Sequence, residues 1–154
     1  AQYTYKFDSW SVANNATVTG DMTIKANFTR TTNKYTVTFV VNDATLGTVT
    51  PATIADVEYG KTITISGNKV TINGTSATAS TKIISGYTVT FVNWTGASNG
   101  ATVTGNLTIT ANFTKSVISY SITYDYAGGS LPSGQTNQTS YTIESATFTL
   151  INPT

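Results

Sequence analysis

The sequence predicts an all-β or mostly β protein, built from small modules repeated along the chain. Three observations lead to this expectation. Apolar residues alternate with Thr over many short segments, Gly- and Asn-rich breaks separate these segments, and one long passage occurs twice. Thr is the most frequent residue and only 10% of the residues are charged. Because β-branched Thr suits a half-exposed pleated surface, strands are expected over nearly the whole chain.

The repeat defines the organisation of the chain. The passage FDSWSVANNATVTGDMTIKANFTR at residues 7–30 returns as FVNWTGASNGATVTGNLTITANFTK at residues 91–115. The aromatic positions recur 84 residues apart, Tyr3, Phe7 and Trp10 matching Tyr87, Phe91 and Trp94. After a one-residue insertion the offset becomes 85, and the passages from Lys34 and Ser119 are also 85 apart. The period is therefore about 85 residues.

This period divides the chain into one complete module and two halves. Residues 31–115 form the complete module, residues 1–30 are the second half of an earlier module, and residues 116–154 are the first half of a later one. The order predicts a linear, head-to-tail array of modules. The chain opens without a start Met or a signal peptide, so we expect a mature segment or a fragment.

Alternation places the strands within the complete module. Residues 35–41 put Tyr35, Val37 and Phe39 on one face, and residues 107–113 do the same with Leu107 and Ile109. Further strands are expected at 61–65, 69–72, 87–94 and 101–105, with turns at 41–51, 58–61, 66–68, 73–75 and 95–100. The only short helix candidate is ASTKII, residues 79–84.

Composition argues against chemistry and against several partners. The net charge is +1 with basic residues spread singly, so neither nucleic acid binding nor membrane insertion is expected. Without Cys or His, we expect no cofactor, no metal site and no catalytic residues, and the chain is not expected to be an enzyme. The spaced carboxylates Asp56 and Glu58 are better explained as a solvated strand edge than as an acid–base pair or calcium site.

Two covalent modifications are also disfavoured. Seven Asn-x-Thr sequences occur in which x is not Pro, and a Thr- and Asn-rich β protein produces them by chance. Lys25 and Lys61 are the candidates for a Lys–Asn or Lys–Asp cross-link, but Lys25 is replaced by Thr110 in the second copy, which a repeat-defining cross-link would not permit.

The order YTVTF, GTVTP, VEYGKTITI, GYTVTFVNWTG and TVTGNLTITANF resembles the divergent internalin-B-type B repeat. The tail YSITYDYAGGSLPSGQTNQTSYTIESATFTLINPT is similar to the first half of the related Listeria-Bacteroides repeat. The resemblance implies a small β-grasp-like module in bacterial surface proteins that act as stalks, adhesins or spacers. The stretch from Gly67 to Ser85 is longer than the family's central connection, which leaves open an extra hairpin there.

These observations lead to one functional expectation and one alternative. We expect a structural repeat of a bacterial extracellular surface protein, stalk or filament, whose incomplete end modules are completed by a neighbouring copy or an adjoining repeat. Trp94 should be a core anchor, whereas the half-modules should expose apolar residues. The expected assembly residues are Phe7, Trp10, Ile24, Phe28, Tyr120, Ile122, Phe148 and Leu150. The alternative is an adhesin module that binds a host glycan, protein or matrix ligand through Tyr59, Tyr124, Tyr126 and Tyr141.

Overall fold

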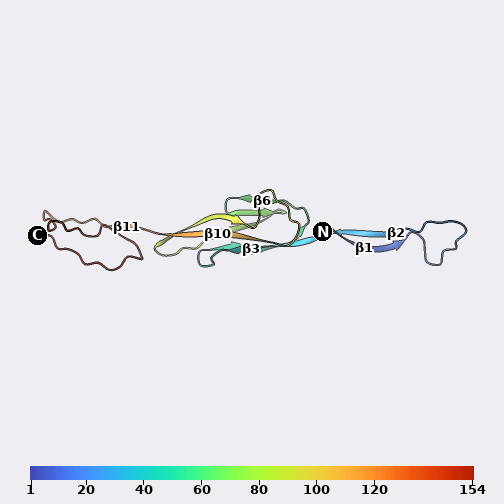
Figure 1. Cartoon of the computed structure of the whole chain (residues 1–154), viewed down its shortest axis with the longest axis horizontal. Helices are drawn as coiled ribbons and strands as arrows, with labels where there is room; N and C mark the ends of the chain where they lie inside the picture. The colour runs from blue at the N-terminus through green and yellow to red at the C-terminus, as the bar shows by residue number, and fades with distance from the viewer.

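The computed structural model describes residues 1–154, and the chain is all-β, with strands and no helix. Figure 1 shows three parts along its long axis: a hairpin from the first residues at one end, a central body, and the last residues at the other end. The division at residues 30 and 115 is a prediction from the repeat. We call residues 1–30 the head and residues 116–154 the tail.

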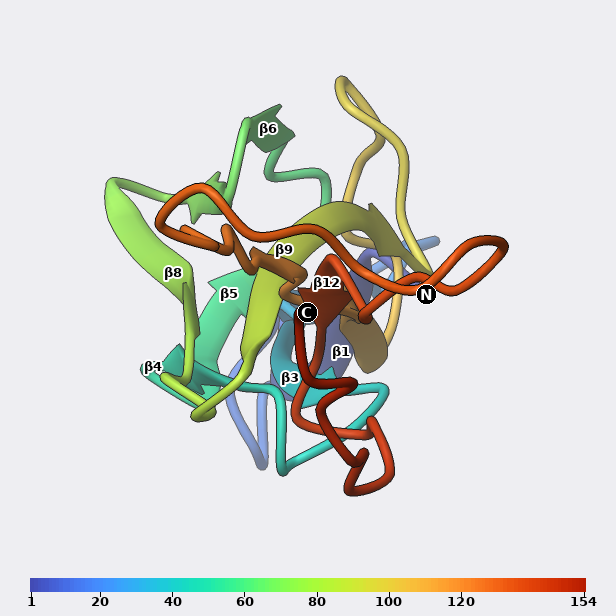
Figure 2. The ribbon, with the colours of Figure 1, turned by 90° about the vertical axis from the view of Figure 1, so that its left-hand side faces the viewer.

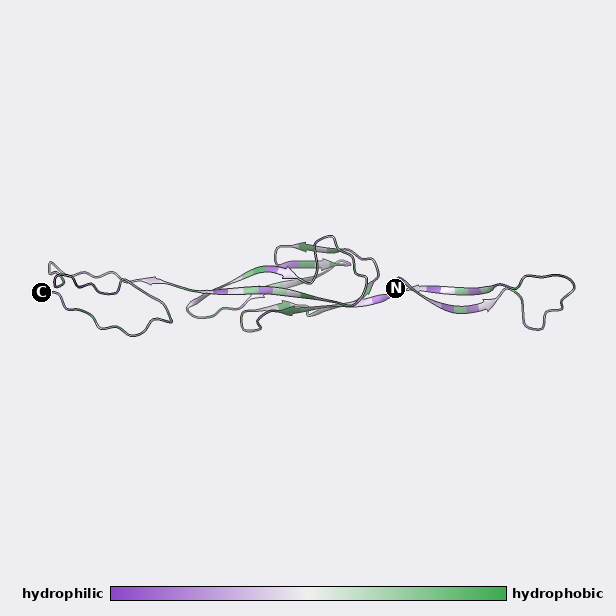
Figure 3. Cartoon of the chain, viewed as in Figure 1, coloured by the Kyte–Doolittle hydropathy of each residue, from purple (hydrophilic) through white to green (hydrophobic).

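The head is a single antiparallel hairpin. Strand β1 (Tyr3–Trp10) pairs with β2 (Ala26–Thr32), and Phe7 lies opposite Phe28. Their hydropathy alternates along both strands in Figure 3, as expected for a hairpin with one face meant for burial.

The central module consists of two four-stranded sheets. The first sheet has the order β5-β3-β10-β9, formed by β5 (Thr53–Glu58), β3 (Lys34–Val41), β10 (Leu107–Val117) and β9 (Tyr87–Thr95). Within it β10 runs parallel to β3, and the other pairs are antiparallel. The second sheet is antiparallel, with the order β4-β8-β7-β6: β4 (Gly47–Thr50), β8 (Thr75–Thr81), β7 (Lys69–Ile72) and β6 (Ile63–Ser66).

The core lies between these two sheets. Fifteen buried apolar residues form one cluster, in which Val37, Phe39 and Ile109 come from the first sheet and Ile63 and Ile72 from the second. In the view along the long axis in Figure 2, β8 and β4 lie beside β5, β3 and β9, so the cluster is enclosed from both sides. The predicted core anchor Trp94 is buried there, its ring 6.0 Å from that of Phe39.

The stretch from Gly67 to Ser85 carries an extra hairpin, which completes the second sheet. Strands β7 and β8 turn at Asn73 and Gly74, both with positive φ, as a tight two-residue hairpin requires. The helix candidate at residues 79–84 is wrong, because Ala77 and Ala79 belong to β8 and are buried in the core. No helix crosses the sheets, so the fully β form of the expected fold is the one observed and the grasp-type helix is not present.

Two local predictions also need correction. The expected turn at residues 41–51 contains β4, since Gly47 lets the chain pass against the Phe113 ring, where a Cβ atom would lie 2.5 Å from the ring. The expected strand at residues 101–105 is only an isolated bridge, Thr62 to Thr102. It is held by backbone bonds from Ile63 N–H to the Ala101 carbonyl and from Val103 N–H to the Lys61 carbonyl.

The tail contains little regular structure. Two short strands, β11 (Tyr120–Ser121) and β12 (Ser140–Tyr141), form an antiparallel pair. Asn137 is buried and bonds to both backbone groups of Ile151, accepting from its N–H at 2.7 Å and donating to its carbonyl at 3.1 Å. This contact holds the final residues against the rest of the tail.

Candidate assembly surfaces

The repeated passages fold into the same hairpin. In the head Phe7 faces Phe28 and Trp10 faces Ala26, and 84 or 85 residues later Phe91 faces Phe113 and Trp94 faces Ala111. Both pairs skip one residue at the same place, Asp8 in β1 and Val92 in β9. Because a bulge and a register are specific to a sequence, their recurrence makes the head hairpin a structural copy of β9–β10.

The junctions that follow the two hairpins also repeat. Arg30 lies 4.6 Å above the Tyr3 ring, and Lys115 lies 4.7 Å above the Tyr87 ring. Each junction contains an equivalent backbone hydrogen bond. The Asn33 N–H donates to the Gln2 carbonyl in the first junction, and the Ile118 N–H donates to the Gly86 carbonyl in the second. The second junction has an added contact, in which the Tyr87 hydroxyl donates to Glu144 at 2.7 Å. That hydrogen bond to a carboxylate raises the pKa of Tyr87 above its usual value.

The two hairpins differ in what covers them. In the central module Trp94, Ile109 and Phe113 are 8%, 0% and 2% exposed. Their counterparts in the head, Trp10, Ile24 and Phe28, are 54%, 48% and 60% exposed, and Phe7 is exposed beside them. The predicted apolar face of the head is therefore present and uncovered.

The uncovered hairpin is also shorter. In β10, residues Leu107–Ala111 pair in parallel with Val37–Val41 of β3. The head has the matching residues 22–26, but no strand takes the place of β3 beside them, and β2 begins only at Ala26. The segment MTIKANF, residues 22–28, is thus a strand only from Ala26, where β1 pairs with it, because strands are stabilised by their partners.

The tail has the opposite deficiency. Its pair Tyr120 and Tyr141 takes the place of Tyr35 and Val57 in the pairing of β3 with β5. The residues that match the rest of β3, from Ile122 to Tyr126, are not a strand, and the segment YTIESATFTLI is a strand only at its first residue, Tyr141. Ile122 is half-buried, whereas Tyr120, Phe148 and Leu150 are exposed. What is missing beside them is a strand corresponding to β10.

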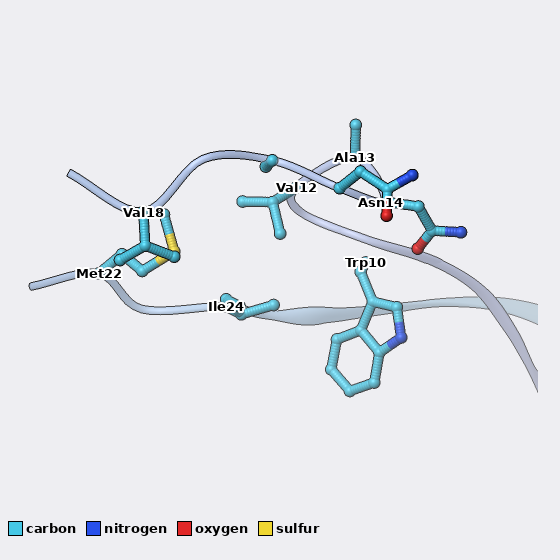
Figure 4. Close-up of a pocket in the computed structure, with 9 residues that line it drawn as sticks. Trp10, Val12, Ala13, Asn14, Val18, Met22 and Ile24 are labelled. Carbon is cyan, nitrogen blue, oxygen red and sulfur yellow. The ribbon is translucent and has the colours of Figure 1, made fainter. Parts of the chain in front are cut away.

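The head loop adds a pocket that the sequence did not predict. It has a volume of about 430 Å³ and is lined by Trp10, Val12, Ala13, Asn14, Asn15, Ala16, Val18, Met22 and Ile24. Figure 4 shows the Trp10 indole and Ile24 along one wall and Val12 facing them. The repeat could have indicated it, since the matching residues Ala101, Val103 and Ile109 pack in the core of the central module.

The four tyrosines proposed as ligand-facing do not form one surface. Tyr59 is half-buried, in the central module, with its ring 6.5 Å from Tyr35. Tyr124 and Tyr126 stack in parallel at 5.9 Å, and the Tyr124 hydroxyl donates to the Gln138 carbonyl. Tyr141 is exposed and stacks on Tyr120.

The ionisable residues are dispersed. Glu58 pairs with Lys61 at 3.7 Å, and Asp56 has a positive φ at the bulge of β5 against β3. The pKa of Asp43 is lowered because its carboxylate accepts bonds from the Thr45 hydroxyl and N–H, which fixes the turn before β4. No three His, Cys, Asp or Glu residues lie together in a metal-binding arrangement.

Comparisons of the chain with protein-family models, with curated proteins and with solved structures find no match. The structure contains no helix of the length and hydropathy needed to cross a membrane. The exposed apolar residues of the head and of the tail are the features left to interpret.

Proposed function

We propose that the chain is a structural repeat of a bacterial extracellular stalk or filament, in which modules follow one another head to tail. The observation that carries the proposal is the duplicated hairpin, which is covered in the central module and uncovered in the head. An array of modules would cover every such hairpin except the one at its end. The resemblance to the internalin-B-type and Listeria-Bacteroides repeats supports an extracellular location.

The adhesin alternative receives no comparable support. Tyr124 and Tyr141 take the places of Phe39 and Val57, which are core residues of the central module. The stacked tyrosines of the tail are therefore better explained as the interior of the next module than as a binding surface.

Two copies joined in one polypeptide test this function, because the joint places a tail directly before a head. Small-angle X-ray scattering should give a rigid rod with a maximum dimension close to twice that of one copy. A flexible or compact particle would contradict the proposal.

The joined protein contains Phe28 twice, once in each copy, and this provides a matched control. Phe28→Asp in the second copy puts a charge into the rebuilt module and should make the joint flexible. The same substitution in the first copy lies on a free head and should leave the rod unchanged. If both variants behave alike, the joint is not a packed module.

A further inference from the structure

The central module contains both halves of the contact that the head and tail lack, so it gives the geometry in which they would meet. We propose that residues 22–26 of one copy pair in parallel with residues 122–126 of a second copy, with Lys25 opposite Asp125. In the same contact, Phe148 of the second copy occupies the pocket beside Trp10. The inference rests on the proposed function, since it names the partner surface and register of the array.

The register follows from β10 and β3. Their parallel pairing sets Leu107 beside Val37, Ile109 beside Phe39, and Ala111 beside Val41. In the repeat, the head residues 22–26 match β10 residues 107–111, and the tail residues 122–126 match β3 residues 37–41. The same register therefore sets Met22 beside Ile122, Ile24 beside Tyr124, and Ala26 beside Tyr126. The tail is ready for this pairing, because Ile122, Tyr124 and Tyr126 are already half-buried while Thr123 and Asp125 between them are exposed.

Charge favours the contact between a head and a tail. Lys25 and Asp125 fall opposite one another on the outer face, where the central module has Thr110 beside Val40. Opposite charges therefore meet only when a head pairs with a tail. Lys25 forms no ion pair within its own chain, and Asp125 accepts only the N–H of Ala127 at 2.9 Å. Opposite charges directly across two strands stabilise the pair, and like charges destabilise it.

A second polar contact supports the same register. Asn106 begins the approach to β10, and its side-chain oxygen accepts the N–H of Thr36 in β3 at 3.0 Å. The repeat puts Asp21 in the place of Asn106 and Ser121 in the place of Thr36. A carboxylate accepts an N–H at least as well as an amide oxygen does, so this contact is retained with Asp21.

The pocket beside Trp10 matches Phe148. In the central module, Thr62 forms a β-bridge with Thr102, and Ile63 is the next residue. The Ile63 side chain belongs to the same core cluster as Trp94, Val103 and Ile109. The tail repeats the frame Thr-x-Thr with Phe148 in the place of Ile63. The counterparts of the other three residues are Trp10, Val18 and Ile24, which line the pocket.

An apolar side chain suits this place. Ile63 belongs to one buried cluster with Val70 and Ile72 of the hairpin β7–β8. Exposed Leu150 lies two residues further on the same face.

The contact must join two copies. The head and the tail lie at opposite ends of the long axis in Figure 1, so one chain cannot bring them together. Each copy offers one head and one tail, and such a heterologous contact that does not close on itself builds a line. Because it rebuilds the interior of a module, we expect it to bury more than about 2,000 Å² in total.

Charge reversal tests the register. Sedimentation velocity of the 154-residue chain should show assembly that grows with concentration. Lys25→Asp and Asp125→Lys should each place like charges opposite and weaken assembly about tenfold. An equimolar mixture of the two variants should restore it, since each head then meets a tail of opposite charge. Lys6→Asp, on the exposed face of β1 away from the contact, should assemble as the unmodified chain does.

Two further variants test the contact itself. Phe148→Asp should abolish assembly, whereas Ile83→Asp, at a fully exposed apolar residue of the central module, should not. A chain with Thr23→Cys and Thr123→Cys should form a ladder of disulfide-linked oligomers on oxidation, because these positions match Thr108 beside Thr38. Thr23→Cys with Ser121→Cys, two residues out of register, should give far fewer links.

The outcomes separate the two proposals. Single variants that assemble like the unmodified chain, or a mixture that fails to recover, would overturn the register while leaving the array in place. An unmodified chain that stays monomeric up to millimolar concentration would overturn the pairing between copies. The array of modules would still be judged independently by the rigidity of the two joined copies.

Discussion

At the scale of single residues, burial here is a property of the surroundings and not of the sequence position. Trp10 and Trp94 occupy the same place in the same hairpin, next to equivalent bulges. Trp94 packs against Phe39 and Phe91 and donates its indole N–H to the Gly67 carbonyl at 3.2 Å. Trp10 packs against Phe7, the counterpart of Phe91, but has no counterpart of the Phe39 ring or of the hydrogen bond to the Gly67 carbonyl.

The two tryptophans should therefore respond differently to the same substitution. Trp94→Ala should lower the free energy of unfolding by about 3–5 kcal/mol, because it leaves a cavity in the core and an unpaired carbonyl at Gly67. Trp10→Ala in a dilute, monomeric sample should change it by less than about 1 kcal/mol. Urea denaturation followed by circular dichroism measures both. Equal losses would show that the head hairpin is covered in solution.

At the scale of elements, a strand in this protein exists only where a partner strand is available. The segments MTIKANF and LTITANF have the same alternation, so the sequence predicts a strand for both. Only the second is a full strand, because β3 lies beside Leu107–Ala111 and no strand takes that place beside residues 22–25. Alternation reports which face is suited to burial and contains no information about whether a partner is present.

Asn42, directly after β3, adds a side-chain contact to β10 beyond the ladder of the two strands. Its side chain donates to the Phe113 carbonyl at 2.9 Å and accepts the Phe113 N–H at 2.8 Å, both in a partly buried place. Asn42→Ala should cost about 2–3 kcal/mol, since two backbone groups lose their partners. Asn152→Ala, at an exposed residue near the end of the chain, is the control and should be neutral. A neutral Asn42→Ala, measured by thermal and urea unfolding, would mean that water replaces the amide.

At the scale of the whole molecule, the repeat was more informative than the local patterns. Period, strand faces and the core role of Trp94 were predictable because apolar residues recur at fixed spacing. Strands β4 and β8 were not, since GTVT lies within a Gly- and Asp-containing segment and TSATAST is built from small residues that suit a close approach of two sheets. The pocket beside Trp10 depends on loop packing, which has no periodic signal.

The core suggests a sharp test of the module boundaries. All fifteen residues of the buried cluster lie from Val37 to Phe113, so residues 31–115 contain the whole core and, apart from the last two residues of β10, all eight strands of both sheets. That fragment should unfold in one cooperative transition, with a midpoint within a few degrees of the main transition of the full chain.

A fragment of the same length in the other frame, residues 1–85, keeps β3 but loses β9 and β10, the strands that carry Trp94, Ile109 and Phe113. With β3 left without its parallel partner, the first sheet cannot form and the second has nothing to pack against. Differential scanning calorimetry should therefore find a transition in residues 31–115 and none in residues 1–85. A featureless melt of the first fragment, or a cooperative melt of the second, would show that the folding unit does not follow the repeat.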